Sequence, residues 1–306
     1  MNIHALRKQE EPDFIRIWQE CFGDSEEVIR EFLSYFKNTL RLFVLEDEGR
    51  ICASLSQFRM GSWISGSGLE SGPDVLVSYA IGTEGASRGR GYGSAITAFA
   101  RDRAVEEGNV SLLCPANQGL VDFYRPLGYQ TIFRMNEGFL DLKEKANAGK
   151  SQKNSFAASG FRNIPGAFYC SMRERFLQGR VHISLSEDAV RAITECAPPE
   201  GAFWISSDDS VIFAAEAGED PEEYRILECL TRNGSVCGRP RLIEILQGSG
   251  RSALRFRVPL NEADGAENQG LVQAMAVLPE GLIMPDSPED CISGERKLPW
   301  FGFPFE

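Results

Sequence analysis

Histidine and paired cysteine are scarce in this 306-residue chain, which has two histidines and eight cysteines, none of them in a Cys-x-x-Cys pair. A structural zinc or iron–sulfur site needs clustered thiolates or imidazoles, so we expect no metal. The first residues lack the apolar segment of a signal peptide, and no apolar run approaches the roughly 18 residues of a membrane span. The sequence predicts a cytoplasmic protein with reduced, buried thiols and no membrane partner.

Positive charge is also in short supply, because 32 Lys and Arg residues stand against 44 Asp and Glu residues, a formal net charge of −12. A nucleic-acid backbone must be met by a surplus of basic side chains, so we expect no nucleic-acid partner. An acidic surface instead suits a cationic partner. With 42% apolar residues the chain can bury a substantial core, and its length predicts two domains.

One short stretch differs from the rest of this acidic chain. Residues 143–163 carry five basic residues and one acidic residue, and they show neither helical nor strand periodicity. Such a segment indicates a linker or a long exposed loop. We therefore expect a first domain over 1–142, a linker over 143–163 and a second domain over 164–306. A basic loop on one continuous domain is the alternative.

The apolar spacing of residues 1–142 predicts the element order β-α-α-β-β-β-α-β-α-β. Asp24 and Glu27 fit a capping box that starts the second helix. A Glu48-Gly49 turn indicates a hairpin, followed by a loop over 61–72. The expected strands are 2–6, 40–47, 50–60, 74–81, 110–116 and one or two within 129–142, and the expected helices are 11–22, 25–36, 92–107 and 119–125.

A glycine-rich turn joins the central strand to the next helix and reads Gly82-Thr-Glu-Gly-Ala-Ser-Arg-Gly-Arg-Gly-Tyr-Gly93. Such a turn exposes unpaired N–H groups and the positive end of a helix dipole, a natural seat for a phosphate or pyrophosphate. Neither the Rossmann pattern G-x-G-x-x-G nor the Walker pattern fits it. What remains is an Arg-x-x-Gly-x-Gly pattern that starts at Arg88.

This pattern resembles the acyl-CoA pyrophosphate loop of the Gcn5-related N-acetyltransferases, the GNAT superfamily. Asn117 followed by Asp122-Phe-Tyr124-Arg-Pro-Leu-Gly-Tyr129 is similar to a second segment of that family. The resemblance covers residues 1–142 and implies the GNAT fold, a mixed, mostly antiparallel central sheet flanked by helices. The chain departs from many members at Gly85-Ala86-Ser87, where they carry Pro-Glu-Tyr or a similar triplet.

The resemblance implies acetyl-CoA as cosubstrate, with the pantetheine arm on the end of the central strand and the pyrophosphate on the amides of the loop. It assigns cofactor binding to Ile81, Thr83, Arg88, Gly89, Arg90, Gly91, Tyr92, Gly93, Ser94 and Asn117. Tyr124 would give a proton to the departing thiolate. Asn117 could equally be a helix N-cap, and Tyr124 could be a packing residue.

The implied mechanism is direct attack of an amine on the thioester, which requires a base. Glu70, Asp74 and Glu84 lie near the central strand in the sequence, and none of them is preferred. Ser87 matches a Gly-x-Ser-x-Gly elbow, but it lies inside the loop, six residues beyond the strand. A hydrolase triad is therefore disfavoured.

Residues 164–306 repeat an α-β-β-β-α-β order without the Arg-x-x-Gly-x-Gly loop. We expect a smaller, degenerate GNAT-like α+β domain, or else a different α+β unit such as the sterol-carrier-like domain of the enhanced-intracellular-survival acetyltransferases. Its expected helices are 171–178, 186–197 and 239–248, and its strands are a hairpin about Asp208-Asp209, 224–231 and 253–260.

The tail 298–306 has four aromatic residues and should dock in a groove. By similarity to the enhanced-intracellular-survival enzymes, Glu306 would act there as the catalytic base. We therefore expect an acyl-CoA-dependent N-acyltransferase that acetylates a primary amine of a small molecule or peptide. The alternatives are a non-catalytic acyl-CoA sensor and a tandem-type aminoacyl transferase.

Overall fold

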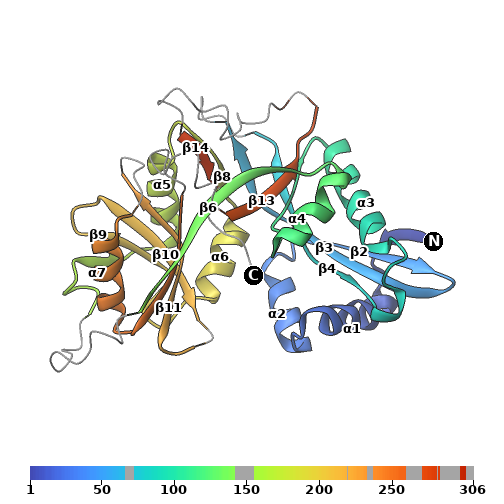
Figure 1. The fold of residues 1–306 in the computed structure, drawn as a ribbon, viewed down its shortest axis with the longest axis horizontal. Helices are drawn as coiled ribbons and strands as arrows, with labels where there is room; N and C mark the ends of the chain where they lie inside the picture. Colours follow the sequence, from blue (N-terminus) through green and yellow to red (C-terminus); the bar gives the residue numbers. More distant parts are fainter. Residues whose placement is uncertain are drawn as a thin grey trace.

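A computed structural model describes residues 1–65, 72–141, 155–218, 220–232, 237–259, 271–280, 282 and 297–300. We call the part before the 142–154 segment the first unit and the part after it the second unit. In Figure 1 the first unit lies on the right and most of the second unit on the left.

The first unit has the predicted order of helices and strands. Its elements are β1 Asn2–Ala5, a 3-10 turn Lys8–Glu10, α1 Glu11–Phe22, α2 Glu26–Tyr35, β2 Arg41–Asp47, β3 Arg50–Ile64, β4 Asp74–Thr83, a 3-10 turn Gly85–Ser87, α3 Tyr92–Glu106, β5 Val110–Leu113, α4 Gln118–Tyr124, a 3-10 turn Arg125–Leu127 and β6 Gln130–Asp141. The expected α+β order, including the short first strand, is therefore confirmed.

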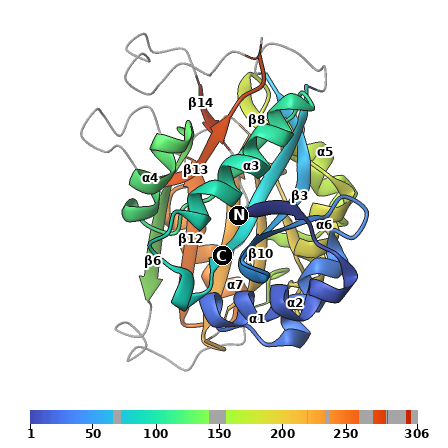
Figure 2. The ribbon, with the colours of Figure 1, turned by 90° about the vertical axis from the view of Figure 1, so that its right-hand side faces the viewer.

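The sheet of the first unit is antiparallel from β1 to β4, whereas β4 and β5 run parallel. Helices α1 and α2 cover one face and α3 and α4 the other (Figure 1). Successive residues of a strand point to opposite faces, so Val44 packs with α1 while Phe43 and Leu45 pack with α3. β1 forms the outer edge, at the front of Figure 2.

Two local predictions need correction. Ser25, not Asp24, caps α2 by accepting a hydrogen bond from the Val28 amide, while Asp24 accepts one from the indole N–H of Trp18 at 2.8 Å. The predicted loop 61–72 begins too early, because β3 runs to Ile64 and pairs on its second edge with a strand of the second unit. Trp63 is buried at that junction and is only 1% exposed.

The second unit contains the predicted elements and several short strands that its sequence pattern did not show. Its elements are β7 Phe161–Asn163, α5 Gly166–Phe176, β8 Arg180–Leu185, α6 Glu187–Glu195, β9 Phe203–Ser206, β10 Val211–Ala217, β11 Glu223–Thr231, α7 Arg239–Ser249, β12 Ala253–Pro259, β13 Leu271–Val277 and β14 Lys297–Trp300. β9 and β10 form the expected hairpin about Asp208-Asp209.

The second unit repeats the strand pattern of the first. β7, β9, β10 and β11 are antiparallel in that order, and β11 and β12 then run parallel, as β4 and β5 do. A second sheet with helices on its faces is therefore present, as the repeated order of elements predicts.

The two units share strands at their junction. β13 lies between β5 and β6 in the first sheet, and β6 continues into the second sheet as the antiparallel neighbour of β12. β6 accordingly crosses from one half of the molecule to the other in Figure 1. The strands form one continuous sheet in the order β5-β13-β6-β12 at this junction.

The part of the predicted linker that the structure describes, residues 155–163, packs on the second unit. Phe156 lies against Trp204 and Tyr224, and Phe161 begins β7. These two aromatic side chains anchor an otherwise polar segment in the core of the second unit. The seven cysteines among the described residues are free thiols. None of the described helices is long and apolar enough to span a membrane.

Candidate functional site

The central feature of the first unit is a gap between two parallel strands. β4 pairs with β5 only from Val75 to Val77, yet it continues to Thr83. Its pairing with β3 shifts register beside Ala80, whose φ of 50° lies in the left-handed region. A non-glycine residue with this φ is uncommon and is held by its surroundings. The bulge lies beyond the last pair between the two strands, and we call the region where β4 (residues 78–83) and β5 no longer pair the slot.

The glycine-rich loop leads from this slot into α3. Gly89 and Gly91 have φ of 78° and 79°, and open space surrounds the position of a Cβ at both residues. Gly91 is the N-cap of α3, so the first turn of the helix offers N–H groups without intrahelical partners. A Cβ on Gly93 would lie 3.4 Å from the Thr83 hydroxyl oxygen. The loop thus places a helix N-terminus beside the end of β4, where it favours an anion.

The two loop arginines lie differently from each other. The Arg88 Nε donates to the Thr83 carbonyl at 3.2 Å, so its guanidinium folds back over the end of β4. Arg90 is exposed and hydrogen-bonded to Tyr92, which raises the pKa of Arg90. The Tyr92 hydroxyl in turn donates to Asp47 at 2.6 Å. Both arginines therefore add positive charge to the loop.

Glu84 braces the start of the loop. It is buried and accepts hydrogen bonds from Arg16 at 2.9 Å, from Arg50 at 3.0 Å and from the Ser87 hydroxyl at 3.2 Å. Burial opposes its ionisation, but Arg16, Arg50 and Ser87 outweigh it, and the pKa of Glu84 is lowered. A carboxylate held in this way is a poor base. Ser87 donates its hydroxyl hydrogen to Glu84, so it lacks the histidine partner that a hydrolase serine would require.

Tyr124 lies on α4 beside the slot. It packs with Leu113 at the end of β5, with Val121 and Tyr129, and with Ile81 at the end of β4. Burial raises the pKa of Tyr124 to about 12, so its hydroxyl stays protonated at neutral pH. The residue is therefore a packing residue whose hydroxyl carries its proton.

Asn117 takes the structural role that the sequence left open. Its side chain accepts a hydrogen bond from the Leu120 amide at 3.0 Å and caps α4. The residue is exposed, and its amide nitrogen is left for other partners.

The remaining candidate bases are Asp74, Glu70 and Glu306. Asp74 lies at the opposite end of β4 from the slot, paired with Arg59 at 2.6 Å. Glu70 and Glu306 lie outside the described residues. Two residues at the slot feel charges of the second unit: Glu216 acts electrostatically on Tyr79, and Arg257 acts on Cys114. The sequence pattern could not reveal this grouping, because the shared strands create it.

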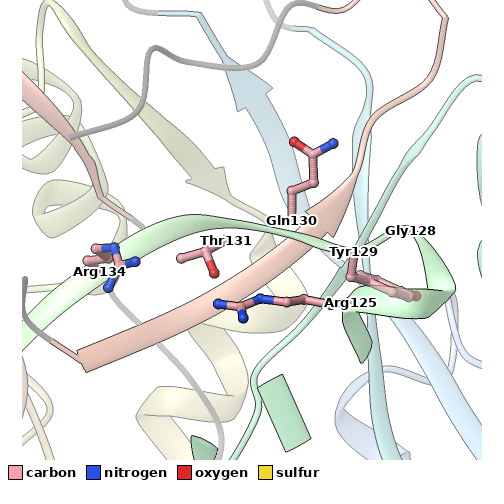
Figure 3. Close-up of a pocket in the computed structure, with 6 residues that line it drawn as sticks. All are labelled: Arg125, Gly128, Tyr129, Gln130, Thr131 and Arg134. Atoms are coloured by element: carbon pink, nitrogen blue, oxygen red, sulfur yellow. The ribbon is translucent and has the colours of Figure 1, made fainter. Parts of the chain in front are cut away.

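Two further groups of polar side chains lie outside the predicted site. A pocket of about 410 Å³ is lined by Arg125, Gly128, Tyr129, Gln130, Thr131 and Arg134, along β6 and the turn before it (Figure 3). It contains none of the predicted site residues. Near the edge strand β1, the potential metal ligands of His4, Glu10 and Glu46 lie within 4.8 Å of one another.

Comparisons with known proteins agree with this geometry. A family model described as an acetyltransferase (GNAT) domain matches residues 2–132. A probable N-acyltransferase from Enterococcus faecalis V583 is 12% identical with a TM-score of 0.63, over 91% of this chain and 73% of that chain. A GCN5-related N-acetyltransferase from Kribbella flavida is 14% identical with a TM-score of 0.62, over 90% and 71% of the two chains.

Eis1 from Mycobacterium abscessus is 11% identical with a TM-score of 0.56, over 85% of this chain and 67% of that chain. No curated protein matches the sequence. The similarity to these solved structures spans both units and shows a common fold.

Proposed function

Because residues 2–132 belong to the GNAT acetyltransferase family, we propose that this chain transfers an acetyl group from acetyl-CoA to a primary amine. The observation that supports the donor is the slot between β4 and β5, which opens beside a glycine-rich loop and the N-terminus of α3. This combination offers a hydrogen-bonding edge for an amide-containing arm and a cradle for a pyrophosphate.

The donor supplies an activated thioester, and the residues of this chain hold it and move protons around it. The amides from Arg88 to Ser94 bind the pyrophosphate, with Arg88 and Arg90 adding charge. The backbone of Ile81 and Thr83 holds the pantetheine arm, which Asn117 can contact from α4. Gly89, Gly91 and Gly93 leave room for the cofactor, and the hydrogen bond from Tyr92 to Asp47 fixes the loop. Tyr124 protonates the leaving sulfur.

The acceptor is proposed to be a cationic amine of a small molecule or peptide, because the chain carries a net charge of −12. The second unit lacks an Arg-x-x-Gly-x-Gly loop between β11 and α7, which supports one donor site per chain. We place the reaction in the cytoplasm, where seven free thiols would stay reduced.

Calorimetry of acetyl-CoA binding tests the donor site. Gly91→Glu puts a carboxylate where the pyrophosphate is expected and should abolish binding. Gly108→Glu is its matched control, because Gly108 has φ of 78° against 79° at Gly91 and the same open surroundings, but lies beyond the opposite end of α3. Binding that survives in Gly91→Glu, or is lost equally in both folded variants, would refute the donor site.

Turnover tests the chemistry. Tyr124→Phe should lower kcat by about 10²–10⁴-fold and leave the acetyl-CoA affinity unchanged, because it removes only the proposed acid. A wild type that binds acetyl-CoA but acetylates no amine, with a silent Tyr124→Phe variant, would identify a sensor instead. Deletion of residues 304–306 tests Glu306 as base, since unchanged kcat in a folded variant would exclude that role.

A further inference from the structure

The proposed reaction requires a proton acceptor that β4 itself does not provide. Once the acceptor nitrogen bonds to the carbonyl carbon, it must lose a proton. β4 contains no Asp or Glu after Asp74, which lies at its far end, and Glu84 beyond it is held by two arginines. The proton acceptor must therefore come from another part of the chain.

The second unit brings one carboxylate toward Tyr79, which lies on β4 one residue before the bulge. Glu216, near the end of β10, is within electrostatic range of Tyr79. Contacts of neighbouring residues connect β10 to β4. The amide of Ala217 donates to the Cys196 carbonyl at 3.0 Å, and Cys196 is hydrogen-bonded to Tyr35 of α2.

The same helix completes the connection to β4. Phe32, one turn before Tyr35, stacks on Tyr79 with ring centroids 4.8 Å apart. Glu216 and Tyr79 are thus joined through α6 and α2, on the face of β4 opposite α3 and α4.

A second charge of the second unit approaches the other side of the slot. Arg257 of β12 is buried and acts electrostatically on Cys114, the residue directly after β5. It lies 3.6 Å from Glu137 of β6, while Glu216 pairs with Arg225 of β11 at 3.0 Å. The two sides of the slot, Tyr79 and Cys114, therefore each lie near a charged group of the second unit.

We propose that Glu216 of the second unit accepts the proton of the attacking amine, directly or through one water. This inference rests on the proposed acetyl transfer. The amine lone pair forms the N–C bond, and the carboxylate of Glu216 takes a proton from that nitrogen. The C–S bond then breaks, its electron pair leaves on sulfur, and the Tyr124 hydroxyl supplies the thiol proton. Solvent returns a proton to Tyr124 and removes one from Glu216, so the products are an amide and a thiol.

The surroundings of Glu216 suit this role. Its side chain keeps 22% of its surface exposed, so it can be reached, although protein surrounds most of it. Burial raises the pKa of Glu216, and Arg225 and Arg257 oppose the shift without cancelling it. The other titratable groups that face it are Tyr79 from β4 and Cys196 at the end of α6. A raised pKa makes the carboxylate a stronger base, while its pairing with Arg225 keeps it oriented.

Two other carboxylates serve as rivals in the test. Asp24 acts on Tyr79 more strongly than Glu216 does, but its Oδ2 already accepts the Trp18 indole N–H at 2.8 Å. Glu223 is the matched control, because it also lies beside Arg225, at 3.9 Å, and is directed to Arg255 at 3.1 Å. Removing its charge disturbs the same arginine without touching the proposed base.

The experiment compares Glu216→Gln with Glu223→Gln and Asp24→Asn in acetyl-CoA calorimetry and in steady-state kinetics across pH. Glu216→Gln should bind acetyl-CoA as the wild type does and lose about 10²–10⁴-fold in kcat. In the acidic range, kcat/KM of the wild type should depend on two protons, one from the amine and one from Glu216. For Glu216→Gln, kcat/KM should depend on one proton only. A merely structural role of Glu216 would leave the acidic limb of the pH profile unchanged, and Glu216→Asp should restore that limb in part.

Three results would overturn the inference. Glu216→Gln with wild-type kcat and an unchanged acidic limb would exclude this base. Loss of the limb in Asp24→Asn, or on removal of residues 304–306, would assign the proton to those groups instead. A wild type without acetyl-CoA binding or turnover would refute the proposed function itself. Acetyl-CoA binding, measured apart from turnover, distinguishes a failure of the proposed function from a failure of this inference.

Discussion

The fully buried ion pair of the second unit gives a sharp test of what holds this fold together. Arg173 of α5 and Glu228 of β11 have fully buried side chains whose Nε and Oε2 atoms lie 2.9 Å apart. The Tyr169 hydroxyl donates to the same Oε2 atom at 2.5 Å, and Arg173 Nη1 donates to the Ile183 carbonyl at 2.6 Å. Because Ile183 on β8 pairs with Trp63 of β3, the group also supports the junction with the first unit.

Glu228→Gln should lower the free energy of unfolding by about 3–5 kcal/mol, the usual effect of leaving one partner of a buried pair without its counter-charge. Arginine cannot escape this cost by losing its proton, because its pKa is too high. Glu26→Gln is the surface control. Glu26 pairs with Arg30 at 2.8 Å, both side chains are more than half exposed, and the change should cost less than about 1 kcal/mol.

The assay is urea unfolding of the three proteins at neutral pH, followed by circular dichroism. A double variant, Arg173→Met with Glu228→Gln, should be more stable than Glu228→Gln alone, because no buried charge is left unpaired. If Glu228→Gln falls within about 1 kcal/mol of the wild type, or if the double variant is the least stable, the buried charge is not what makes the single substitution costly.

Two further predictions concern the slot. Because the pKa of Glu84 is lowered, its bonds to Arg16 and Arg50 stabilise the fold above the ordinary glutamate pKa and weaken as the pH falls through the lowered value. Glu84→Gln should lower the free energy of unfolding by about 1 kcal/mol at neutral pH, because the paired arginines are partly exposed. This loss should shrink toward pH 3. A constant difference between the variant and the wild type across pH would contradict the reasoning. At the bulge, Ala80→Gly should change stability by less than about 1 kcal/mol, because relief of the left-handed backbone offsets the entropy cost of glycine, whereas Ala80→Val should cost about 1–3 kcal/mol. Thermal unfolding of the two variants distinguishes them, and equal effects would show that the backbone at Ala80 is not strained.

Local sequence signals predicted the first unit well because its elements carry their own start and stop residues. Pro12 lies in the first turn of α1, and Gly23 ends it with φ of 83°. The apolar run of β4 identified a central strand. The predicted capping residue of α2 was wrong because Asp24 and Ser25 are adjacent and both suit the position. The hydrogen bond from Trp18 to Asp24, six residues apart in sequence, decides between them.

The strands that the sequence missed depend on partners rather than on pattern. β7 and β8 are short, and β8 is fixed by pairing with β3 and β14. The extension of β3 to Ile64 has the same origin. The loop residues Gly89, Gly91 and Gly93 could be found because a motif specifies them, whereas the approach of Glu216 to Tyr79 follows from tertiary contacts that leave no local signal.

The shared strands join the second unit to the first. β6 pairs with β12 of the second unit, and β13 lies between β5 and β6. A chain cut after the first unit would lose β13 and leave unpaired strand edges at β5 and β6, which favour aggregation. The two units therefore share one continuous sheet. A second unit that lacks the donor loop still has a physical reason to be retained, because its β13 completes the first sheet.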